Sequence, residues 1–237
     1  MIEINNVTKK YGKKIALDNL SLKIASGDIF AFVGHNGAGK TTCIKCMTDI
    51  LEFDSGDILY DKVSIKNYPI ECKKQIAYIP DNPDLYEFLK GIEYLNFIAD
   101  VYEMDNSRNE KINKYAEMFE LKEYLANPVS SYSHGMKQKL AIIGALIHDP
   151  KYLILDEPFV GLDPVSTKKL KDVMKELTKK GTAIFFSTHV LEVAEKLCNK
   201  VAIIKNGKLV VTGEMSKVLK DKSLEDIFME LQNENTN

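Results

Sequence analysis

The residues best suited to chemistry form a glycine-rich run, GHNGAGKT, at residues 34–41, which matches the pattern G-x-x-x-x-G-K-[ST]. In such a run the glycines let backbone N–H groups turn toward a phosphate, and the N-terminus of the following helix adds positive charge. The lysine would bridge the β- and γ-phosphates of a nucleotide, and the threonine hydroxyl would coordinate Mg²⁺. The predicted phosphate-binding residues are Gly34, Asn36, Gly37, Ala38, Gly39, Lys40, Thr41 and Thr42.

The neighbouring sequence supports this interpretation over a glycine-rich turn with an exposed lysine. The run directly follows IFAFV (29–33), which is apolar without alternation, as expected for a strand covered on both faces. It opens KTTCIKCMTDIL (40–51), which we expect to be a helix. The strand–loop–helix order is the context that a phosphate-binding loop needs.

A pair of adjacent carboxylates, Asp156 and Glu157, ends a second apolar run, YLILDE (152–157). Neighbouring residues on a strand point to opposite faces, so we expect the two carboxylates to diverge. Asp156 would hold the Mg²⁺ shell through water. Glu157 would polarise the attacking water as a general base, a role that contributes about 10²–10⁴-fold. A solvated strand end is the alternative, which the preceding phosphate loop disfavours.

A histidine, His189, ends the third apolar run, TAIFFSTH (182–189). Ligands of open α/β sheets bind at the carboxyl ends of the strands, so we expect this side chain near the γ-phosphate, where it would hold water together with Glu157. A purely structural histidine is the alternative. Asp163 has two compatible interpretations: an N-cap for a helix beginning near Pro164, or a residue that communicates with a second chain.

Other patterns indicate how these residues are positioned. Alternation in residues 2–24 predicts antiparallel strands, and the three apolar runs interspersed with helical patterns predict a mostly parallel α/β sheet. Apolar residues at helical spacing in 88–150 predict an inserted α-helical subdomain. Asn206-Gly207 predicts a type I′ hairpin turn within 201–213. Ser223 and Asp226 form a capping-box pattern at the start of a final helix.

The expected organisation is therefore a single domain over residues 1–237. Its core would comprise 1–87, which includes the antiparallel β part, and 151–215. The helical subdomain at 88–150 interrupts this core, and a helix and tail at 216–237 follow it.

Composition excludes several classes of function. The 237 residues are 45% hydrophobic and carry a formal charge of −2, without the basic footprint of a nucleic-acid-binding protein. No apolar run approaches the ~20 residues that span a bilayer, and the N-terminus lacks a signal-peptide pattern, so we expect a soluble protein. Arg108, the only arginine, is expected to be a surface charge. Free buried thiols are expected at Cys43, Cys46, Cys72 and Cys198.

The motif order resembles that of the nucleotide-binding subunits of ABC (ATP-binding cassette) transporters over nearly the whole chain. Tyr11 matches the aromatic residue that stacks on adenine, and Asp81 lies where the family has the glutamine of its Q-loop. YSHGMKQK (132–139) matches the signature motif usually written LSGGQ. GLDP (161–164) matches the D-loop, and His189 the switch histidine.

The resemblance implies an ATPase of the P-loop NTPase fold that uses ATP and Mg²⁺, with Asp81 as a further metal ligand. It also implies a head-to-tail dimer with a second copy or a homologous subunit, in which Ser133 and Gly135 act on ATP bound to the opposite chain. His134 and Met136 replace the first glycine and the glutamine of the signature motif. This variant is most similar to exporter ATPases for antibiotics, peptides or drugs.

A transmembrane permease is the implied partner, and it would hold the chain at the inner face of the cell membrane. We expect a permease helix in a groove near Tyr86 and Phe88. Two other functions stay open. One is a soluble ABC ATPase acting on DNA or ribosomes, disfavoured by the single phosphate loop and the short stretch between Lys40 and Ser133. The other is a regulatory or immunity subunit that hydrolyses ATP poorly.

Overall fold

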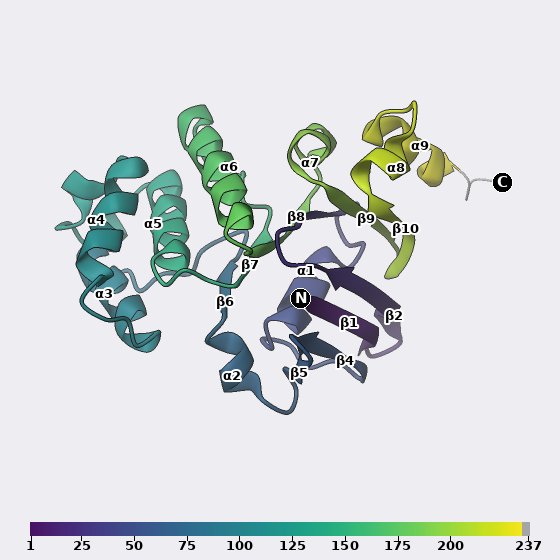
Figure 1. Ribbon diagram of the computed structural model, residues 1–237, viewed down its shortest axis with the longest axis horizontal. Coiled ribbons are helices and arrows are strands. Elements are labelled where there is room, and N and C mark those ends of the chain that lie inside the picture. The colour runs from purple at the N-terminus through teal and green to yellow at the C-terminus, as the bar shows by residue number, and fades with distance from the viewer. Residues whose placement is uncertain (234–237) are drawn as a thin grey trace.

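A six-stranded sheet forms the centre of the computed structural model, which describes residues 1–233 (Figure 1). Its strand order is β10-β9-β3-β8-β7-β6, and every neighbouring pair is parallel except β9 and β10. The strands are β3 (Ile29–Val33), β6 (Ile76–Ile79), β7 (Tyr152–Asp156), β8 (Ala183–Thr188), β9 (Lys200–Lys205) and β10 (Lys208–Glu214). The predicted mostly parallel α/β sheet is confirmed.

The three predicted apolar runs, β3, β7 and β8, are buried along their full lengths. Side chains of β3 alternate between two hydrophobic clusters: Phe30 and Phe32 belong to one, and Ala31 and Val33 to the other. In register, Val33 pairs with Thr188, and Asp156 pairs with Ser187. The carboxyl ends of these three strands therefore meet at one edge of the sheet.

Helices cover both faces of this sheet. The cluster with Phe30 contains α1 (Lys40–Met47), and the opposite cluster contains α6 (Pro164–Lys179) and α7 (Leu191–Leu197). α1 ends four residues earlier than predicted. All four cysteines are free and buried in these two clusters, as expected.

A second, antiparallel sheet has the order β2-β1-β4-β5. β1 (Ile2–Tyr11) and β2 (Lys14–Ile24) are the two predicted strands, whereas β4 (Ser55–Tyr60) and β5 (Val63–Ser64) were not predicted. The short helix α2 (Pro69–Lys73) follows β5. The inward side chains of β1 and β2 join the cluster that contains α1, so this sheet packs beside the phosphate loop.

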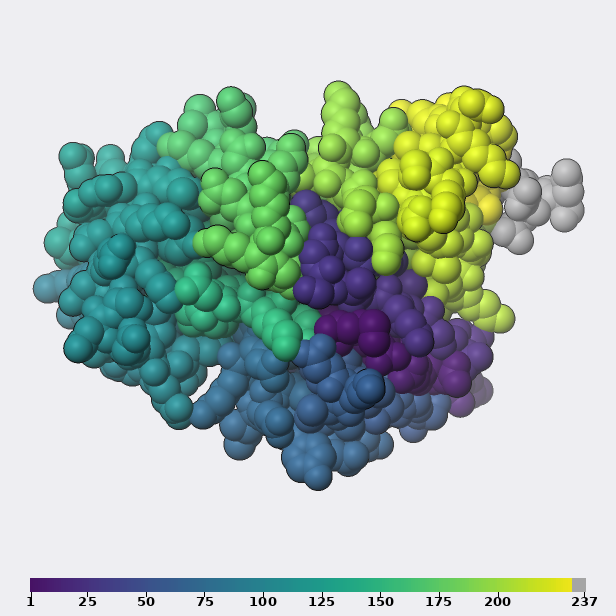
Figure 2. Space-filling model, in the orientation of Figure 1, coloured from purple at the N-terminus to yellow at the C-terminus, as the bar shows by residue number. Residues whose placement is uncertain are grey.

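The chain between β6 and β7 is helical, and no strand lies among residues 91–150, all of which the structure describes. It contains α3 (Gly91–Val101), α4 (Arg108–Met118), α5 (His134–Leu146) and 3-10 turns at Lys122–Tyr124 and Val129–Ser131. Figure 2 shows this teal segment and the blue segment that includes α2 meeting at the lower left of the molecule.

The C-terminal elements follow their predicted signals. Asn206 (φ 50°) and Gly207 (φ 79°) join β9 to β10 with the two positive φ values of a type I′ turn. α8 (Met215–Leu219) precedes α9 (Leu224–Asn233). Ser223 N donates to Asp226 Oδ2 and Asp226 N donates to Ser223 Oγ, both at 3.1 Å, so the capping box is present. The predicted tail beyond residue 233 lies outside the described residues.

Candidate nucleotide-binding site

The glycine-rich run forms the loop between β3 and α1, at the edge where the strands end. Different constraints require glycine at different positions of this loop. A Cβ at Gly34 would lie 2.7 Å from the Ile204 carbonyl oxygen. Gly39 has φ +115°, and its Cβ would lie 2.6 Å from the Ala16 carbonyl oxygen. A Cβ at Gly37 would meet no atom within 4 Å, so only its φ of +81° favours glycine there.

Lys40, at the first position of α1, turns its side chain back into the loop. Its Nζ donates to the carbonyl oxygens of Gly34 (2.7 Å) and His35 (3.3 Å) and lies 3.6 Å from Glu157 Oε1. The side chain is only 7% exposed. A buried ammonium needs partners of this kind, and phosphate oxygens would offer stronger ones because they carry charge.

The two adjacent carboxylates line the same cavity, so the prediction that they point to opposite faces is wrong. β7 ends at Asp156, whose side chain is buried and accepts a hydrogen bond from Ser187 Oγ. Glu157 lies beyond the strand with φ +47°, so strand alternation no longer applies to it. Its backbone N–H donates to Ser187 Oγ at 3.1 Å, which holds this left-handed conformation in place.

His189 lies immediately after β8 and contacts Glu157 directly. Its Nδ1 is 3.0 Å from Glu157 Oε2, and its backbone N–H lies 3.3 Å from the same oxygen. Glu157 is therefore held between Lys40 on one carboxylate oxygen and His189 on the other. The imidazole is 54% exposed and can reach a ligand from the rim.

A cavity of about 210 Å³ unites most of the predicted site. Its lining residues are Ala16, His35, Asn36, Gly37, Gly39, Lys40, Thr41, Thr42, Asp81, Asp156 and Glu157. Sequence reasoning missed His35, although it lies inside the motif, and Ala16, which comes from β2 and carries no sequence signal. The predicted residues outside this lining are Tyr11, Gly34, Ala38, Ser133, Gly135 and His189.

Asp81, which follows β6, faces the same cavity. Burial raises the pKa of its carboxyl group, and the negative charges of Asp156 and Glu157 raise it further. Three carboxylates around one cavity create a demand for positive charge. Lys40 meets this demand in part.

The donors in the cavity fit Mg²⁺, because Thr41 and Asp156 provide hard oxygen ligands. Within residues 1–233, however, no group of three or more His, Cys, Asp or Glu side chains is arranged to hold a metal ion by itself. A magnesium ion here would need oxygens from a bound nucleotide, which is its usual mode of binding.

Tyr11 and the signature residues lie outside the cavity. Tyr11 ends β1, is half exposed, and has Lys9 Nζ 5.5 Å from its ring. Ser133 is the N-cap of α5, and its Oγ accepts from Met136 N at 3.3 Å. α5 therefore begins at His134, within the signature motif. Gly135 lies in its first turn.

Asp163 caps α6, as one of its two interpretations predicted. Its carboxylate accepts from Ser166 N at 2.8 Å and Ser166 Oγ at 2.7 Å, and it pairs with Lys139 Nζ at 2.9 Å. The Lys139 contact, followed by the bonds from Ser166, holds the pKa of Asp163 well below its usual range. Communication with a second chain stays a prediction.

A glycine loop between a buried strand and a helix, with a buried lysine facing a carboxylate at the end of another strand of the same sheet, defines a P-loop NTPase. The sequence profile of the family described as "ABC transporter" matches residues 17–160, and the chain belongs to this family of transporter ATP-binding subunits.

Two relatives from Bacillus subtilis (strain 168) illustrate the similarity. The uncharacterized ABC transporter ATP-binding protein YhcH is 39% identical over 89% of this chain and 68% of its own length. The ABC-type transporter ATP-binding protein EcsA is 32% identical over 99% of this chain and 97% of its own length.

Solved structures agree with the fold. The ATP-binding subunit of an ABC transporter superposes with a TM-score of 0.95 at 31% identity, covering 98% of this chain and 100% of that one. A dimeric post-hydrolysis state of the cassette MJ0796, bound to ADP and Pi, gives a TM-score of 0.82 at 23% identity. It covers 91% of this chain and 99% of that one, and it supports the fold alone.

Proposed function

We propose that this chain binds ATP with Mg²⁺, hydrolyses it, and drives a separate membrane permease. The observation that carries this proposal is the position of Glu157 between Lys40 and His189, in one cavity with the phosphate loop. A glycine-rich turn with a purely structural role would not require a buried lysine next to it that faces a carboxylate.

The mechanism assigns one task to each side chain. Lys40 Nζ exchanges its carbonyl partners, Gly34 and His35, for oxygens of the β- and γ-phosphates. Glu157 accepts a proton from the attacking water through the oxygen that His189 orients. Thr41, Asp156 and Asp81 would hold Mg²⁺, which would supply positive charge to the phosphate oxygens.

The complete site requires a second chain. Ser133 and Gly135 do not line the cavity that contains Lys40 and Glu157 of their own chain. The N-terminus of α5, capped by Ser133, would instead present its amides to ATP on a second copy or a homologous subunit. The fold relative MJ0796 is dimeric in its structure with ADP and Pi, and we propose a dimer for this chain as well.

The replacement Glu157→Gln tests hydrolysis and dimerisation together. The amide cannot accept the proton, so turnover should fall by about 10²–10⁴-fold while ATP binding persists. Size-exclusion chromatography with ATP and Mg²⁺ should then show a stable dimer. The control Lys40→Ala in the same background should remain monomeric. An unchanged elution profile for Glu157→Gln would support a subunit that binds nucleotide but hydrolyses it poorly.

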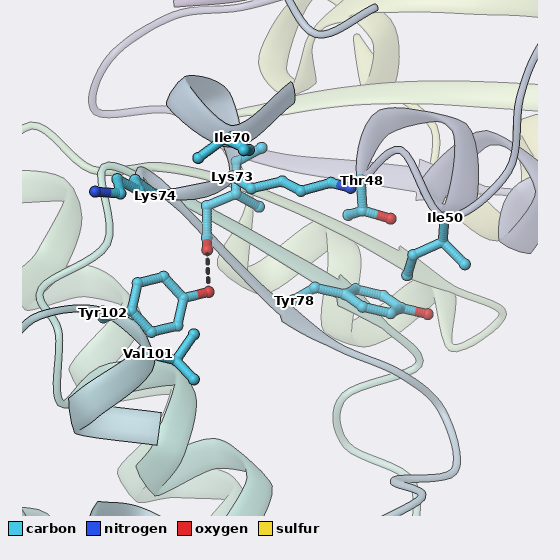
Figure 3. A pocket seen from close by; sticks show the side chains of 9 residues that line it. Thr48, Ile50, Ile70, Lys73, Lys74, Tyr78, Val101 and Tyr102 are labelled. Carbon is cyan, nitrogen blue, oxygen red and sulfur yellow. Dashed lines mark hydrogen bonds between the residues drawn. The ribbon is translucent and has the colours of Figure 1, made fainter. Parts of the chain in front are cut away.

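We place the permease at an apolar groove of about 520 Å³ between α2, β6 and the end of α3 (Figure 3). Tyr102 and Tyr78 face it, and Tyr102 Oη donates to the Ile76 carbonyl at 2.9 Å. Ile70, on α2, is 72% exposed, and Val101 is also exposed at the opposite wall. A permease helix with apolar side chains would bury these surfaces.

Neither Tyr86 nor Phe88 lines this groove, and a permease contact near these two residues stays a separate prediction. Both are exposed, and Tyr86 packs edge-on against Phe97 at 5.5 Å. Phe97 and Val101 are four residues apart on α3 and share a face.

Docking can be tested by copurification with the permease coexpressed with this chain. Ile70→Glu should abolish the complex, because it buries a charge in an apolar contact. Val210→Glu is the matched control, since Val210 is an exposed valine on β10, outside the groove. Copurification that survives Ile70→Glu would exclude this groove.

We propose that the transporter exports its substrate and that this substrate is an antibiotic, peptide or drug-like compound. The linearmycin resistance ATP-binding protein LnrL of Bacillus subtilis is 32% identical over 90% of this chain and 69% of its own length. The chain would lie on the cytoplasmic side of the membrane, held by the permease. No helix within residues 1–233 is long and apolar enough to cross a bilayer.

A further inference from the structure

The imidazole of His134, the residue that departs from the family's signature glycine, folds back onto the turn after Glu157. A Cβ added at Gly161 would lie 2.6 Å from His134 Cδ2 and 2.7 Å from its Nε2. At the neighbouring position, a Cβ on Gly135 would lie 3.0 Å from the Gly161 carbonyl oxygen. The ring thus occupies the space where Gly161 would carry a side chain, and the turn packs closely on the first turn of α5.

A second contact joins α5 to the same segment, two residues further along the chain, at Asp163. Lys139, five residues along α5 from His134, places its Nζ 2.9 Å from Asp163 Oδ2. The Lys139 side chain is 15% exposed and that of Asp163 45%, so this ion pair is open to solvent on the Asp163 side. Asp163 also caps α6. Two residues of α5 therefore contact the segment after Glu157: His134 at Gly161 and Lys139 at Asp163. We call these two contacts the clasp.

The turn held by the clasp begins at the proposed general base. Val160 N donates to the Glu157 carbonyl at 3.1 Å, so residues 157–160 form one closed turn. The Phe159 ring packs edge-on against Phe186 of β8 at 5.7 Å, which anchors the middle of the segment. A shift of α5 would move Gly161 and Asp163 and, through this short anchored segment, the carboxylate of Glu157.

We propose that His134 is a positioning residue that links the N-terminus of α5 to Glu157 of the same chain. This inference rests on the proposed composite dimer. There, α5 faces the nucleotide of the partner subunit while Glu157 faces the chain's own. Binding or hydrolysis of the partner's nucleotide would shift α5, and the clasp would transmit this shift to Glu157 at the chain's own nucleotide. ATP hydrolysis at the two sites would then be cooperative.

Steady-state ATPase activity against ATP concentration measures this coupling. For two coupled sites the wild-type Hill coefficient should lie above 1 and approach ~2. His134→Ala and Lys139→Met should each lower it toward 1, with the unfolding temperature unchanged within a few degrees. Lys169→Met is the matched control: it removes an ion pair between α6 and Glu120 without touching the clasp, and should keep the wild-type coefficient.

A double-mutant cycle tests the contact itself. Gly161→Ala suffers both from φ +78° and from collision with His134, whereas in a His134→Ala background only the backbone strain remains. The fold-loss in kcat caused by Gly161→Ala should therefore be smaller in that background. Equal losses in both backgrounds would overturn the contact.

The outcomes separate this inference from the proposed function. If the wild type neither hydrolyses ATP nor, as Glu157→Gln, dimerises with ATP, the proposed function fails and the clasp has nothing to couple. If the wild type hydrolyses ATP cooperatively and both clasp variants keep its Hill coefficient, the proposed function stands and the positioning role of His134 is refuted. A drop in Lys169→Met equal to that in Lys139→Met refutes it as well.

Discussion

Phe228 of the C-terminal helix α9 packs against His35 of the phosphate loop, with ring centroids 5.2 Å apart and an interplanar angle of 56°. Lys205 Nζ reinforces the attachment by donating to the Leu231 carbonyl at 2.5 Å. The carbonyl of His35 accepts bonds from Ala38 N and Lys40 Nζ. α9 therefore supports the loop at the residue whose backbone shapes the proposed nucleotide site.

Removing this support should weaken ATP binding. Phe228→Ala deletes an aromatic contact that contributes about 0.5–1.5 kcal/mol, so KM for ATP should rise by about 2- to 12-fold with little change in kcat. Met229→Ala is the control, because Met229 is the next residue on α9 but is exposed. Titration with a fluorescent ATP analogue and steady-state kinetics measure both variants. Equal affinities in the two would show that α9 does not support the loop.

Tyr11 should contribute by stacking and not through its hydroxyl. It is half exposed at the end of β1, one residue from the β1–β2 turn, which leaves its ring free for an adenine. Tyr11→Ala should lose about 1–3 kcal/mol of binding, or about 5- to 150-fold in affinity, whereas Tyr11→Phe should bind as the wild type does. Isothermal titration calorimetry with ATP distinguishes them. A loss in Tyr11→Phe equal to that in Tyr11→Ala would assign the role to the hydroxyl.

Arg108 should be dispensable for hydrolysis. It begins α4 in the helical segment, pairs with Asp100 of α3, and lies outside the nucleotide cavity. Exposed ion pairs contribute little, so Arg108→Ala should keep kcat within about twofold and lower stability by less than about 1 kcal/mol. The ATPase assay and thermal unfolding check both values. Loss of ATPase activity with ATP-dependent dimerisation intact would instead identify Arg108 as an arginine finger, which supplies positive charge to the transition state.

Sequence patterns predicted the features that local chemistry sets. The buried strands, the phosphate loop and the type I′ turn at Asn206-Gly207 each follow from composition over a few residues. Strand β6 was not predicted, because four residues are too few to distinguish a buried strand from part of a helix. The start of α5 could have been predicted, since Ser133 is a regular N-cap residue directly before the helix.

Features set by distant contacts could not be predicted. Glu157 leaves the strand pattern because Ser187 and His189, about 30 residues away, hold it at positive φ. Ala16 enters the cavity through the pairing of the antiparallel sheet beside the phosphate loop. The contact of His134 with Gly161 likewise exists only once α5 and the turn after β7 are side by side.

His148, two residues after α5 ends at Leu146, should make the fold sensitive to acid between pH 4 and 6.5. It stacks on Tyr102 with ring centroids 3.6 Å apart, and its Nε2 is buried without a hydrogen-bond partner within the described chain. Burial lowers the pKa of His148 from 6.5 to about 4. Between these pH values His148 is protonated in the unfolded chain but stays neutral in the folded chain. The free energy of unfolding therefore falls as the pH falls.

The loss should reach about 2 kcal/mol between pH 6.5 and 5, because each pKa unit corresponds to about 1.4 kcal/mol. His148→Phe keeps a flat ring against Tyr102 and has no proton to gain, so its urea unfolding midpoint should be nearly the same at pH 7 and pH 5. Asp163 provides an internal control. Its lowered pKa contributes stability that disappears only below about pH 4, where both proteins should lose stability in parallel. An equal drop in the two midpoints between pH 7 and 5 would assign the acid sensitivity to another group.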